Sequence, residues 1–178
     1  MISVSKNITL KPITEQDVSV LYQLMCKIYP AAYSFLWLDK GNWYIHKQYS
    51  KSNILKELKQ LNADYYFVLV DDEIVGNFRI VWDENLSNLQ IENQVKLHRL
   101  YLDEKVQGKG VGKLLMLWLE KQAIAKKYNA IWLDAMDHKQ QAFQFYKKLG
   151  YQYHSHIFLP FDLMFDEVKK MSQLYKKL

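Results

Sequence analysis

Gln107-Gly108-Lys109-Gly110-Val111-Gly112 is a glycine-rich stretch between two segments of opposite character. The strand-like run 95–102 precedes it, and an amphipathic segment with the spacing of a core-facing helix begins at Val111. Such a turn suits a phosphate, because glycines allow positive φ and close backbone approach. The start of a helix adds unpaired N–H groups and a positive dipole end. The stretch therefore predicts a site for a phosphorylated ligand.

The two commonest phosphate-binding loops do not fit this stretch. A P-loop requires Ser or Thr after Gly112-Lys113, where the chain has Leu114, and a glycine at the position of Gln107. The dinucleotide fingerprint G-x-G-x-x-G requires a glycine at the position of Lys113. The stretch does match Q/R-x-x-G-x-G/A, and in this it resembles the pyrophosphate loop of the GNAT acetyltransferase superfamily.

A second segment strengthens the resemblance. Residues 141–151 read Q-A-F-Q-F-Y-K-K-L-G-Y, which is similar to the GNAT pattern N-x-x-A-x-x-F-Y-x-K-x-G-F. Lys139 stands where the family usually has Asn. The two motifs occur in the family's order with a helix between them, and the resemblance covers roughly residues 65–160. Leu-Tyr-Leu before the loop and Trp-Leu-Asp-Ala-Met-Asp-His after it look most like the bacterial spermidine/spermine acetyltransferase branch.

The resemblance implies one α/β domain over residues 1–178, with a mixed, mostly antiparallel twisted sheet flanked by helices. Composition agrees, since 49% hydrophobic and 15% aromatic residues can fill a sizeable core. The single cysteine, Cys26, excludes an internal disulfide. The chain shows no signal-peptide pattern and no apolar run of membrane-spanning length, so we expect a cytoplasmic protein. Many relatives self-associate, which is compatible with a homodimer.

Periodicity and turn residues predict the order of the elements. Thr14 with Asp17 can cap a first helix, which Pro30 should end, and residues 31–49 are expected to be aromatic and irregular. The tail has helical spacing, yet it resembles the last GNAT strand, and we expect a strand over 170–177. The other expected elements are strands at 2–12, 65–70, 74–82, 95–102, 130–133 and 151–159, and helices at 52–61, from 111, and at 140–149.

The net charge of +5 suits an anionic ligand but does not identify one. The basic residues occur as scattered pairs, without the interleaved aromatic residues of a single-strand nucleic-acid binder. Solvated helix faces explain them better than a nucleic-acid or membrane partner. Histidine and cysteine spacings typical of a metal site are also lacking from the sequence.

The resemblance implies acetyl-CoA, or coenzyme A, as the ligand of the loop. Its pyrophosphate would be held by the backbone N–H groups of 107–113, and Lys109 and Lys113 would add charge. In the family, the strand before the loop pairs with the pantetheine arm and supplies an oxyanion hole. The expected cofactor-binding residues are Leu100, Tyr101, Leu102, Gln107, Gly108, Lys109, Gly110, Val111, Gly112, Lys113, Lys139 and Tyr146. The alternative is a turn that binds nothing, which leaves the alternating glycines as an unexplained entropic cost.

Tyr146 is the expected catalytic residue. It matches the family tyrosine that donates a proton to the departing thiolate, a transfer that ordinary pKa values of about 10 for the phenol and about 8.5 for the thiol allow. The alternative is a core tyrosine packed beside Phe143 and Phe145.

The general base is less well determined. Many relatives carry a Glu early in the central strand, but this chain has Lys96 there. His98 is our candidate, with Glu92 a weaker one, although a partly exposed strand histidine with no catalytic role is the commoner case. Neutralising an alkylamine of pKa near 10.4 at pH 7 costs roughly 4.6 kcal/mol, so a base or a water chain matters.

The aromatic segment 29–49 would form the acceptor wall, with Tyr33, Trp37, Asp39 and Trp43 as candidate substrate-binding residues, or it simply packs under a loop. The sequence thus predicts an N-acetyltransferase acting on a primary amine, with a small amine or polyamine favoured, by direct attack in a ternary complex. Three alternatives stay open: a non-catalytic acyl-CoA sensor, with Lys96 and Lys139 as signs of lost chemistry, a protein N-acetyltransferase, and a nucleic-acid-binding protein.

Overall fold

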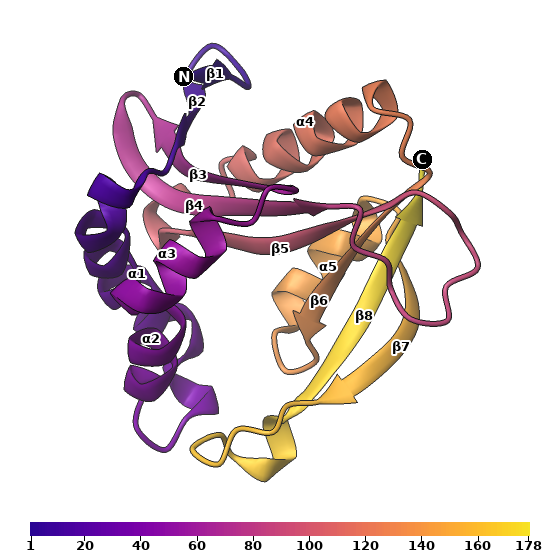
Figure 1. Cartoon of the computed structure of the whole chain (residues 1–178). Coiled ribbons are helices and arrows are strands. Elements are labelled where there is room, and N and C mark those ends of the chain that lie inside the picture. The colour runs from indigo at the N-terminus through magenta and orange to yellow at the C-terminus, as the bar shows by residue number, and fades with distance from the viewer.

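The computed structural model describes all residues, 1–178, and is built on a single eight-stranded sheet (Figure 1). The strand order is β1-β2-β3-β4-β5-β6-β8-β7, and only the β5–β6 pair is parallel. This confirms the predicted mixed, mostly antiparallel sheet. The strands are β1 (Ile2–Ser3), β2 (Ile8–Pro12), β3 (Ala63–Val70), β4 (Glu73–Trp82), β5 (Gln94–Leu102), β6 (Ala130–Met136), β7 (Gln152–Phe158) and β8 (Lys170–Lys177).

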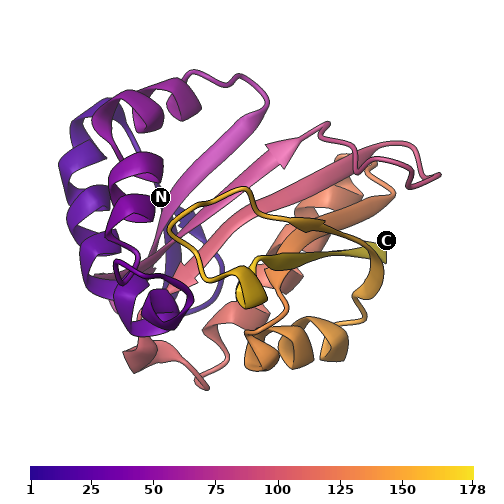
Figure 2. The same cartoon turned by 90° about the horizontal axis from the view of Figure 1, so that it is seen from below.

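Helices cover both faces of the sheet (Figures 1 and 2). On one face lie α1 (Val18–Tyr33), α2 (Asn42–Gln48) and α3 (Lys51–Leu58), and on the other lie α4 (Val111–Ala125) and α5 (Gln140–Lys148). None of these helices combines the length and the apolar character needed to cross a bilayer.

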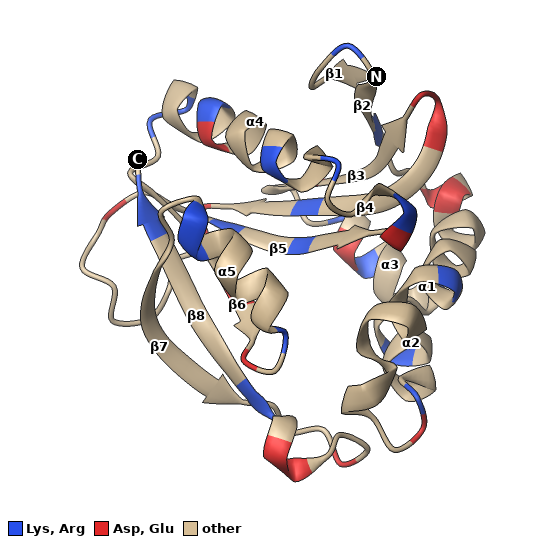
Figure 3. Ribbon diagram, turned by 180° about the vertical axis from the view of Figure 1, so that it is seen from behind, with Lys and Arg blue, Asp and Glu red and all other residues tan.

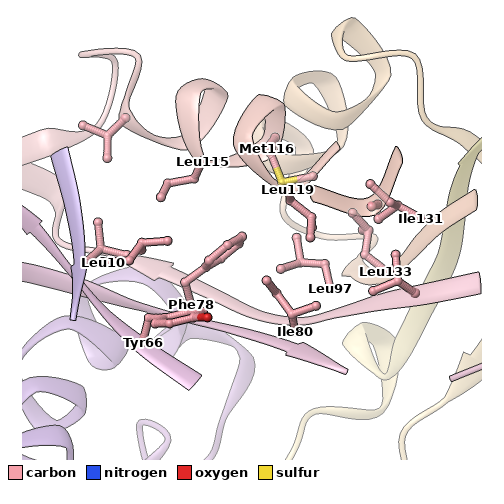
Figure 4. Close-up of a cluster of buried hydrophobic side chains, with 14 of the residues drawn as sticks. Leu10, Tyr66, Phe78, Ile80, Leu97, Leu115, Met116, Leu119, Ile131 and Leu133 are labelled. Atoms are coloured by element: carbon pink, nitrogen blue, oxygen red, sulfur yellow. The ribbon is translucent and has the colours of Figure 1, made fainter. Parts of the chain in front are cut away.

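Each face of the sheet has its own hydrophobic core. In β3, Tyr66 and Val68 belong to the core under α4, whereas Phe67 and Leu69 belong to the core under α1–α3. This division follows from the period of two along a strand, and it explains why β3 is an almost continuous apolar run. Figure 4 shows the first core, where side chains of α4 pack over the middle of the sheet. Its labelled residues are Leu10, Tyr66, Phe78, Ile80, Leu97, Leu115, Met116, Leu119, Ile131 and Leu133.

The parallel strands β5 and β6 stay paired only over their first halves. Their pairing runs from Gln94 opposite Ala130 to Leu97 opposite Leu133, although β5 continues to Leu102 and β6 to Met136. A bulge interrupts the β4–β5 register where β5 begins to leave its partner, between the pairs Arg79–Arg99 and Ile80–Leu97. The second half of β5 therefore has one edge free of strand partners, and this gap positions the site described below.

Gly76 of β4 allows the close approach of β5 at the gap. A Cβ atom at this position would lie 2.2 Å from the carbonyl oxygen of Tyr101 and 2.8 Å from a methyl carbon of Leu102. Because the nearest atom is backbone, the strands would have to separate. We expect Gly76→Ala to lower the free energy of unfolding by about 3 kcal/mol in urea denaturation. Leu61→Ala, at a fully exposed site, should change it by less than about 0.5 kcal/mol. Equal effects of the two changes would refute the close approach.

Three expectations for the N-terminal third are corrected. Pro30 lies inside α1, which continues to Tyr33, because the Pro30 carbonyl still accepts a hydrogen bond from the Ser34 N–H and buried Ile28 and Tyr29 anchor the turn. The segment 31–49 is not irregular, since it contains α2. The strand expected at 2–12 is divided into β1 and β2 by a turn in which the Val4 N–H donates to the Ile8 carbonyl.

The remaining elements lie where the sequence predicts them, within a few residues. Thr14 and Asp17 form the expected capping box at the start of the first helical segment. The tail forms strand β8, which pairs with β6 on one side and β7 on the other. The prediction of a strand at 170–177 is therefore confirmed, although the apolar spacing of the tail alone suggested a helix.

Candidate functional site

Two cavities open on the gap between β5 and β6. The first, here called the loop cavity, measures about 480 Å³ and lies beside the glycine-rich loop. The second, here called the aromatic cavity, measures about 230 Å³ and lies between α1–α2 and the β5–β6 gap. Six residues line both, so the cavities meet: Tyr33, Leu100, Tyr101, Lys139, Ala142 and Tyr146.

Most of the predicted cofactor-binding residues line the loop cavity. These are Leu100, Tyr101, Leu102, Gln107, Gly108, Gly110, Val111, Gly112, Lys113, Lys139 and Tyr146. Lys109 is not among the lining residues. The sequence interpretation missed Ile28 and Ala32 of α1, and Phe145 and Lys148 of α5. Phe145 and Lys148 belong to the second motif, which was available as a signal for them. Ile28 and Ala32 belong to no motif, and only the packing of α1 beside the gap brings them to the cavity.

The glycine-rich loop presents a row of unpaired N–H groups. The backbone N–H groups of residues 108 and 110–113 have no backbone acceptor, and the first such bond of α4 joins the Leu114 N–H to the Gly110 carbonyl at 3.0 Å. Gly108 and Gly110 adopt φ values of +73° and +81°, which few other residues tolerate. Free amides at a helix start, together with Lys113, form a site suited to a phosphate or pyrophosphate.

The free edge of β5 also directs backbone groups into the gap. The Asp103 N–H donates to the Val75 carbonyl at 2.7 Å, and the Tyr101 carbonyl points at Gly76, so both of these residues face β4. Since successive residues of a strand alternate in direction, Leu100 and Leu102 present their N–H and C=O groups to the gap. An extended polar chain lying in the gap can pair with them as a further strand would.

Tyr146 lies where the two cavities meet. Its ring packs against Phe145 and Tyr151, with centroids 5.1 and 5.8 Å apart, and no hydrogen bond joins its hydroxyl group to the protein. Burial raises the pKa of Tyr146 well above its usual value, with a smaller contribution from Tyr33. The hydroxyl group therefore stays protonated near neutral pH and can donate to a group placed in the gap.

Lys139 also lies at the junction and precedes α5. Its ammonium group donates a hydrogen bond to the Ala32 carbonyl at 2.6 Å and lies over the rings of Tyr33 and Phe35, 5.1 and 5.6 Å from their centroids. Desolvation lowers its pKa. No carboxylate oxygen lies within 4 Å of this ammonium group, so its positive charge has no ion-pair partner.

His98 is held in a buried polar network that does not suit a general base. The Arg79 Nη1 atom donates to His98 Nδ1 at 2.6 Å, so the nitrogen with the free lone pair is already occupied. Desolvation, then the charges of Arg99, Arg79 and Lys96, lower the pKa of His98 to about 2. The imidazole is thus neutral and a very weak base, and the role expected for His98 does not fit this geometry.

This network predicts how His98 titrates. With a pKa near 2 in the folded state against about 6.5 when unfolded, the unfolded chain binds one more proton below pH 6.5. Folding stability should therefore fall with acidification, by up to about 1.4 kcal/mol per pH unit from this group. In NMR spectra assigned with His98→Gln, the His98 ring resonances should not shift between pH 5 and 8. An inflection within that range would show that the imidazole is free to accept a proton.

Neither the position where relatives carry Glu nor the weaker candidate Glu92 supplies a base. Lys96 is neutralised by ion pairs with Asp134 and Glu84, at 3.1 and 3.2 Å, and lies 4.2 Å from the Trp132 ring centroid. Glu92, the weaker candidate base, lines neither cavity. No side chain at the site is therefore placed to take the proton of a substrate amine, and solvent water remains as the base.

Two of the four expected substrate-binding residues, Tyr33 and Trp37, line the aromatic cavity. Asp39 and Trp43 do not, because the Asp39 carboxylate accepts hydrogen bonds from the Gly41 and Trp43 N–H groups and so fixes the start of α2. The Trp43 ring packs behind the wall, with its centroid 6.0 Å from that of Trp37. The sequence interpretation missed this capping role of Asp39.

A segment between β7 and β8 closes one end of the aromatic cavity. Trp37 and Met164 form an isolated β-bridge, and the Leu38 N–H donates to the Leu163 carbonyl at 2.9 Å. Figure 2 shows this yellow segment crossing toward the helices of the N-terminal third. The cavity thus has walls from four separate parts of the chain, within 29–48, 96–101, 133–146 and 159–171.

Basic residues outnumber acidic ones on the elements beside the site. Lys and Arg recur along α4, α5 and β8 (Figure 3), and the one acidic residue on these three elements is Glu120 of α4. The structure contains no group of three or more His, Cys, Asp or Glu side chains that could hold a metal ion.

Comparison with known proteins identifies relatives of this chain. The model of a family described as the acetyltransferase (GNAT) family matches residues 21–151. An uncharacterized N-acetyltransferase in the pepI 3' region of Lactobacillus delbrueckii subsp. lactis is 24% identical over 117 residues, which make up 65% of this chain and 68% of that protein.

Solved structures show the same fold. The PaiA N-acetyltransferase from Thermoplasma acidophilum, in complex with coenzyme A, has a TM-score of 0.73 and 20% identity, covering 96% of this chain and 99% of that one. The spermidine N-acetyltransferase from Vibrio cholerae, in complex with coenzyme A and spermine, has a TM-score of 0.69 and 13% identity, covering 97% and 96%. The family match spans most of the chain and includes both the glycine-rich loop and Tyr146, and the chain therefore belongs to the acetyltransferase (GNAT) family.

Proposed function

We propose that this protein transfers the acetyl group of acetyl-CoA to the primary amine of a small molecule, by direct attack in a ternary complex. The observation that carries the proposal is the meeting of two cavities at Tyr146, one with unpaired amides and one with an aromatic wall. A donor in the first cavity and an acceptor in the second would then react across the gap between β5 and β6.

The loop cavity fits acetyl-CoA in its chemistry. The free N–H groups of residues 108 and 110–113, with Lys113, would hold the pyrophosphate, and the gap-facing backbone of Leu100 and Leu102 would pair with the pantetheine arm. An N–H group of β5 aimed at the thioester carbonyl would stabilise the developing oxyanion, a contribution of about 3 kcal/mol for one donor. The coenzyme A bound to similar folds from other organisms supports this assignment.

The reaction requires one proton to reach sulfur and another to leave nitrogen. As the amine nitrogen bonds to the acetyl carbon and the carbon–sulfur bond breaks, the Tyr146 hydroxyl group would donate its proton to the thiolate. Its raised pKa keeps that proton in place before the reaction. The amine would release its own proton to water, since no side chain of the aromatic cavity is a suitable base.

Direct attack is favoured over an acetyl-enzyme intermediate by the position of the single cysteine. Cys26 is exposed on α1 and lines neither cavity. No other thiol exists in the chain to receive the acetyl group.

Initial-rate kinetics test the proposal. With thiol release as the readout, and acetyl-CoA varied at several fixed amine concentrations, we expect double-reciprocal lines that intersect. Parallel lines would contradict direct attack, since they indicate that coenzyme A leaves before the amine reacts. Binding of acetyl-CoA without thiol release for any amine would contradict catalysis and favour a sensor.

A further inference from the structure

We infer that the acceptor is a small aromatic compound whose amine is weakly basic and which carries no second positive charge. This inference rests on the proposed function, because it specifies what occupies the aromatic cavity when acetyl-CoA occupies the other. Such an acceptor differs from the polyamine that the sequence favoured, and the charges around the cavity are the reason for the difference.

The aromatic cavity has no carboxylate left for a cation. Asp134 is the single acidic residue in its lining. One oxygen of Asp134 pairs with the Lys96 ammonium group at 3.1 Å, and the other accepts from the Gln173 side-chain amide at 3.2 Å. Asp39, the carboxylate expected to receive a cationic acceptor, is used in capping α2. An ammonium group entering this cavity would therefore lose its water without gaining an ion pair.

The same cavity has more positive than negative charge in its walls. Glu57 is the only carboxylate that neutralises the two buried arginines Arg79 and Arg99. It lies 3.8 Å from Arg79 and forms a bidentate ion pair with Arg99. Lys139, in the wall itself, has no acidic partner. A second ammonium group on the acceptor would thus meet uncompensated positive charge, while a neutral body would not.

The aromatic wall does not offer the open ring faces that a cation needs. Tyr29 is stacked between Tyr33 and Tyr44, with centroid distances of 5.0 and 4.6 Å. Lys139 already lies over Tyr33, and Trp37 is stacked against Phe161 at 5.7 Å. On Tyr29, Tyr33 and Trp37 the protein's own groups therefore occupy ring faces that a cation would use, and the cavity offers mainly apolar contact to an uncharged acceptor.

The lack of a base favours a weakly basic amine. At pH 7 about one in 2,500 molecules of an alkylamine with pKa near 10.4 is neutral, against about one in ten for an α-amino group with pKa 7.7–8.0. Because His98 accepts a hydrogen bond from Arg79 and Lys96 is itself a cation, neither removes the proton. The site therefore depends on the acceptor arriving neutral. A volume of about 230 Å³ limits the acceptor to less than a drug-sized molecule.

Four acceptors separate the effects of an aromatic ring, of amine basicity and of a second positive charge: phenylalaninamide, lysinamide, phenethylamine and spermidine. Thiol release with saturating acetyl-CoA should give phenylalaninamide the highest kcat/KM at pH 7, at least tenfold above lysinamide and spermidine. Phenethylamine has the same ring but a more basic amine, so its kcat/KM should rise nearly tenfold per pH unit between pH 7 and 9, while that of phenylalaninamide levels off near pH 8. Preference for spermidine or lysinamide would overturn the inference and leave acetyl transfer intact.

Lys139→Gln tests the contribution of the uncompensated charge. The ratio of kcat/KM for phenylalaninamide to that for lysinamide should fall at least threefold in this variant, and measuring a ratio cancels any change in acetyl-CoA binding. An unchanged ratio would overturn the role assigned to Lys139. Release of thiol with none of the four amines, by protein that binds acetyl-CoA, would instead overturn the proposed function itself, so the two failures are distinguishable.

Discussion

Replacing Tyr146 with Phe is expected to lower kcat by about 10²–10⁴-fold while leaving the dissociation constant for acetyl-CoA within about twofold. The variant removes only the hydroxyl group, which makes no hydrogen bond to the protein, so the fold should lose nothing. The expected loss arises because the departing thiolate would no longer receive a proton from a positioned donor. Thiol-release rates and calorimetric binding of acetyl-CoA measure the two quantities.

Tyr151→Phe is the matched control. Tyr151 packs against Tyr146 at 5.8 Å, its hydroxyl group is buried without a partner, and it lines neither cavity. Its kcat should stay within about twofold of the wild type. Unchanged turnover in Tyr146→Phe would refute the proton-donor role and favour a core tyrosine. Because burial raises the pKa of Tyr146, its hydroxyl group should stay protonated up to about pH 10, so its ionisation should not lower the wild-type rate in that range.

The largest expected loss of stability comes from Glu57→Gln. Arg79 and Arg99 are only 2% and 5% exposed, and Glu57 is the carboxylate that both share. The amide would leave two guanidinium groups buried without a counter-charge, a change that typically costs about 3–5 kcal/mol. In a chain of this length that corresponds to a fall in melting temperature on the order of 10 °C. Chemical and thermal denaturation would both measure it.

An exposed ion pair provides the control for Glu57. Glu73 pairs with Lys105 at the surface, where their side chains are 68% and 36% exposed. Glu73→Gln should therefore change the free energy of unfolding by less than about 1 kcal/mol. If Glu57→Gln changed the free energy of unfolding as little as Glu73→Gln, the charges of Arg79 and Arg99 would have to be compensated by groups other than Glu57. The charge argument for the aromatic cavity would then weaken.

Local signals in the sequence predicted the parts of the fold that depend on near neighbours. The glycines of the loop, the period of α4 and the turn between β3 and β4 act within a few residues, and each element formed where expected. Pro30 shows the limit of such rules, because packing of Ile28 and Tyr29 holds the helix through it. Strand β8 needed the family resemblance, since its pairing with β6 is a long-range contact that its own spacing does not reveal.

The candidate site likewise has a part that local sequence signals predicted and a part that depends on long-range contacts. Residues in the two motifs line the loop cavity, because a motif places its own backbone. A polar network connects Glu57, Arg79, His98 and Arg99 through contacts between residues 19 to 42 positions apart. No short sequence motif predicts such a network. Sequence reasoning therefore identified His98 from its residue type and strand position, whereas its environment removes the basicity that the choice assumed. The charge balance of the aromatic cavity is likewise visible only after folding.

Thermal melting with coenzyme A, acetyl-CoA, ATP and NAD, each at high concentration, tests the central claim most directly. A ligand at 100 times its dissociation constant stabilises the fold by about 2.7 kcal/mol, which in a domain of this size raises the melting temperature by roughly 5–10 °C. If the free amides of the glycine-rich loop and the gap-facing backbone of β5 bind the coenzyme, coenzyme A and acetyl-CoA should give this rise, and ATP and NAD should not. No rise with either coenzyme would contradict the assignment of the loop cavity and, with it, the role proposed for Tyr146.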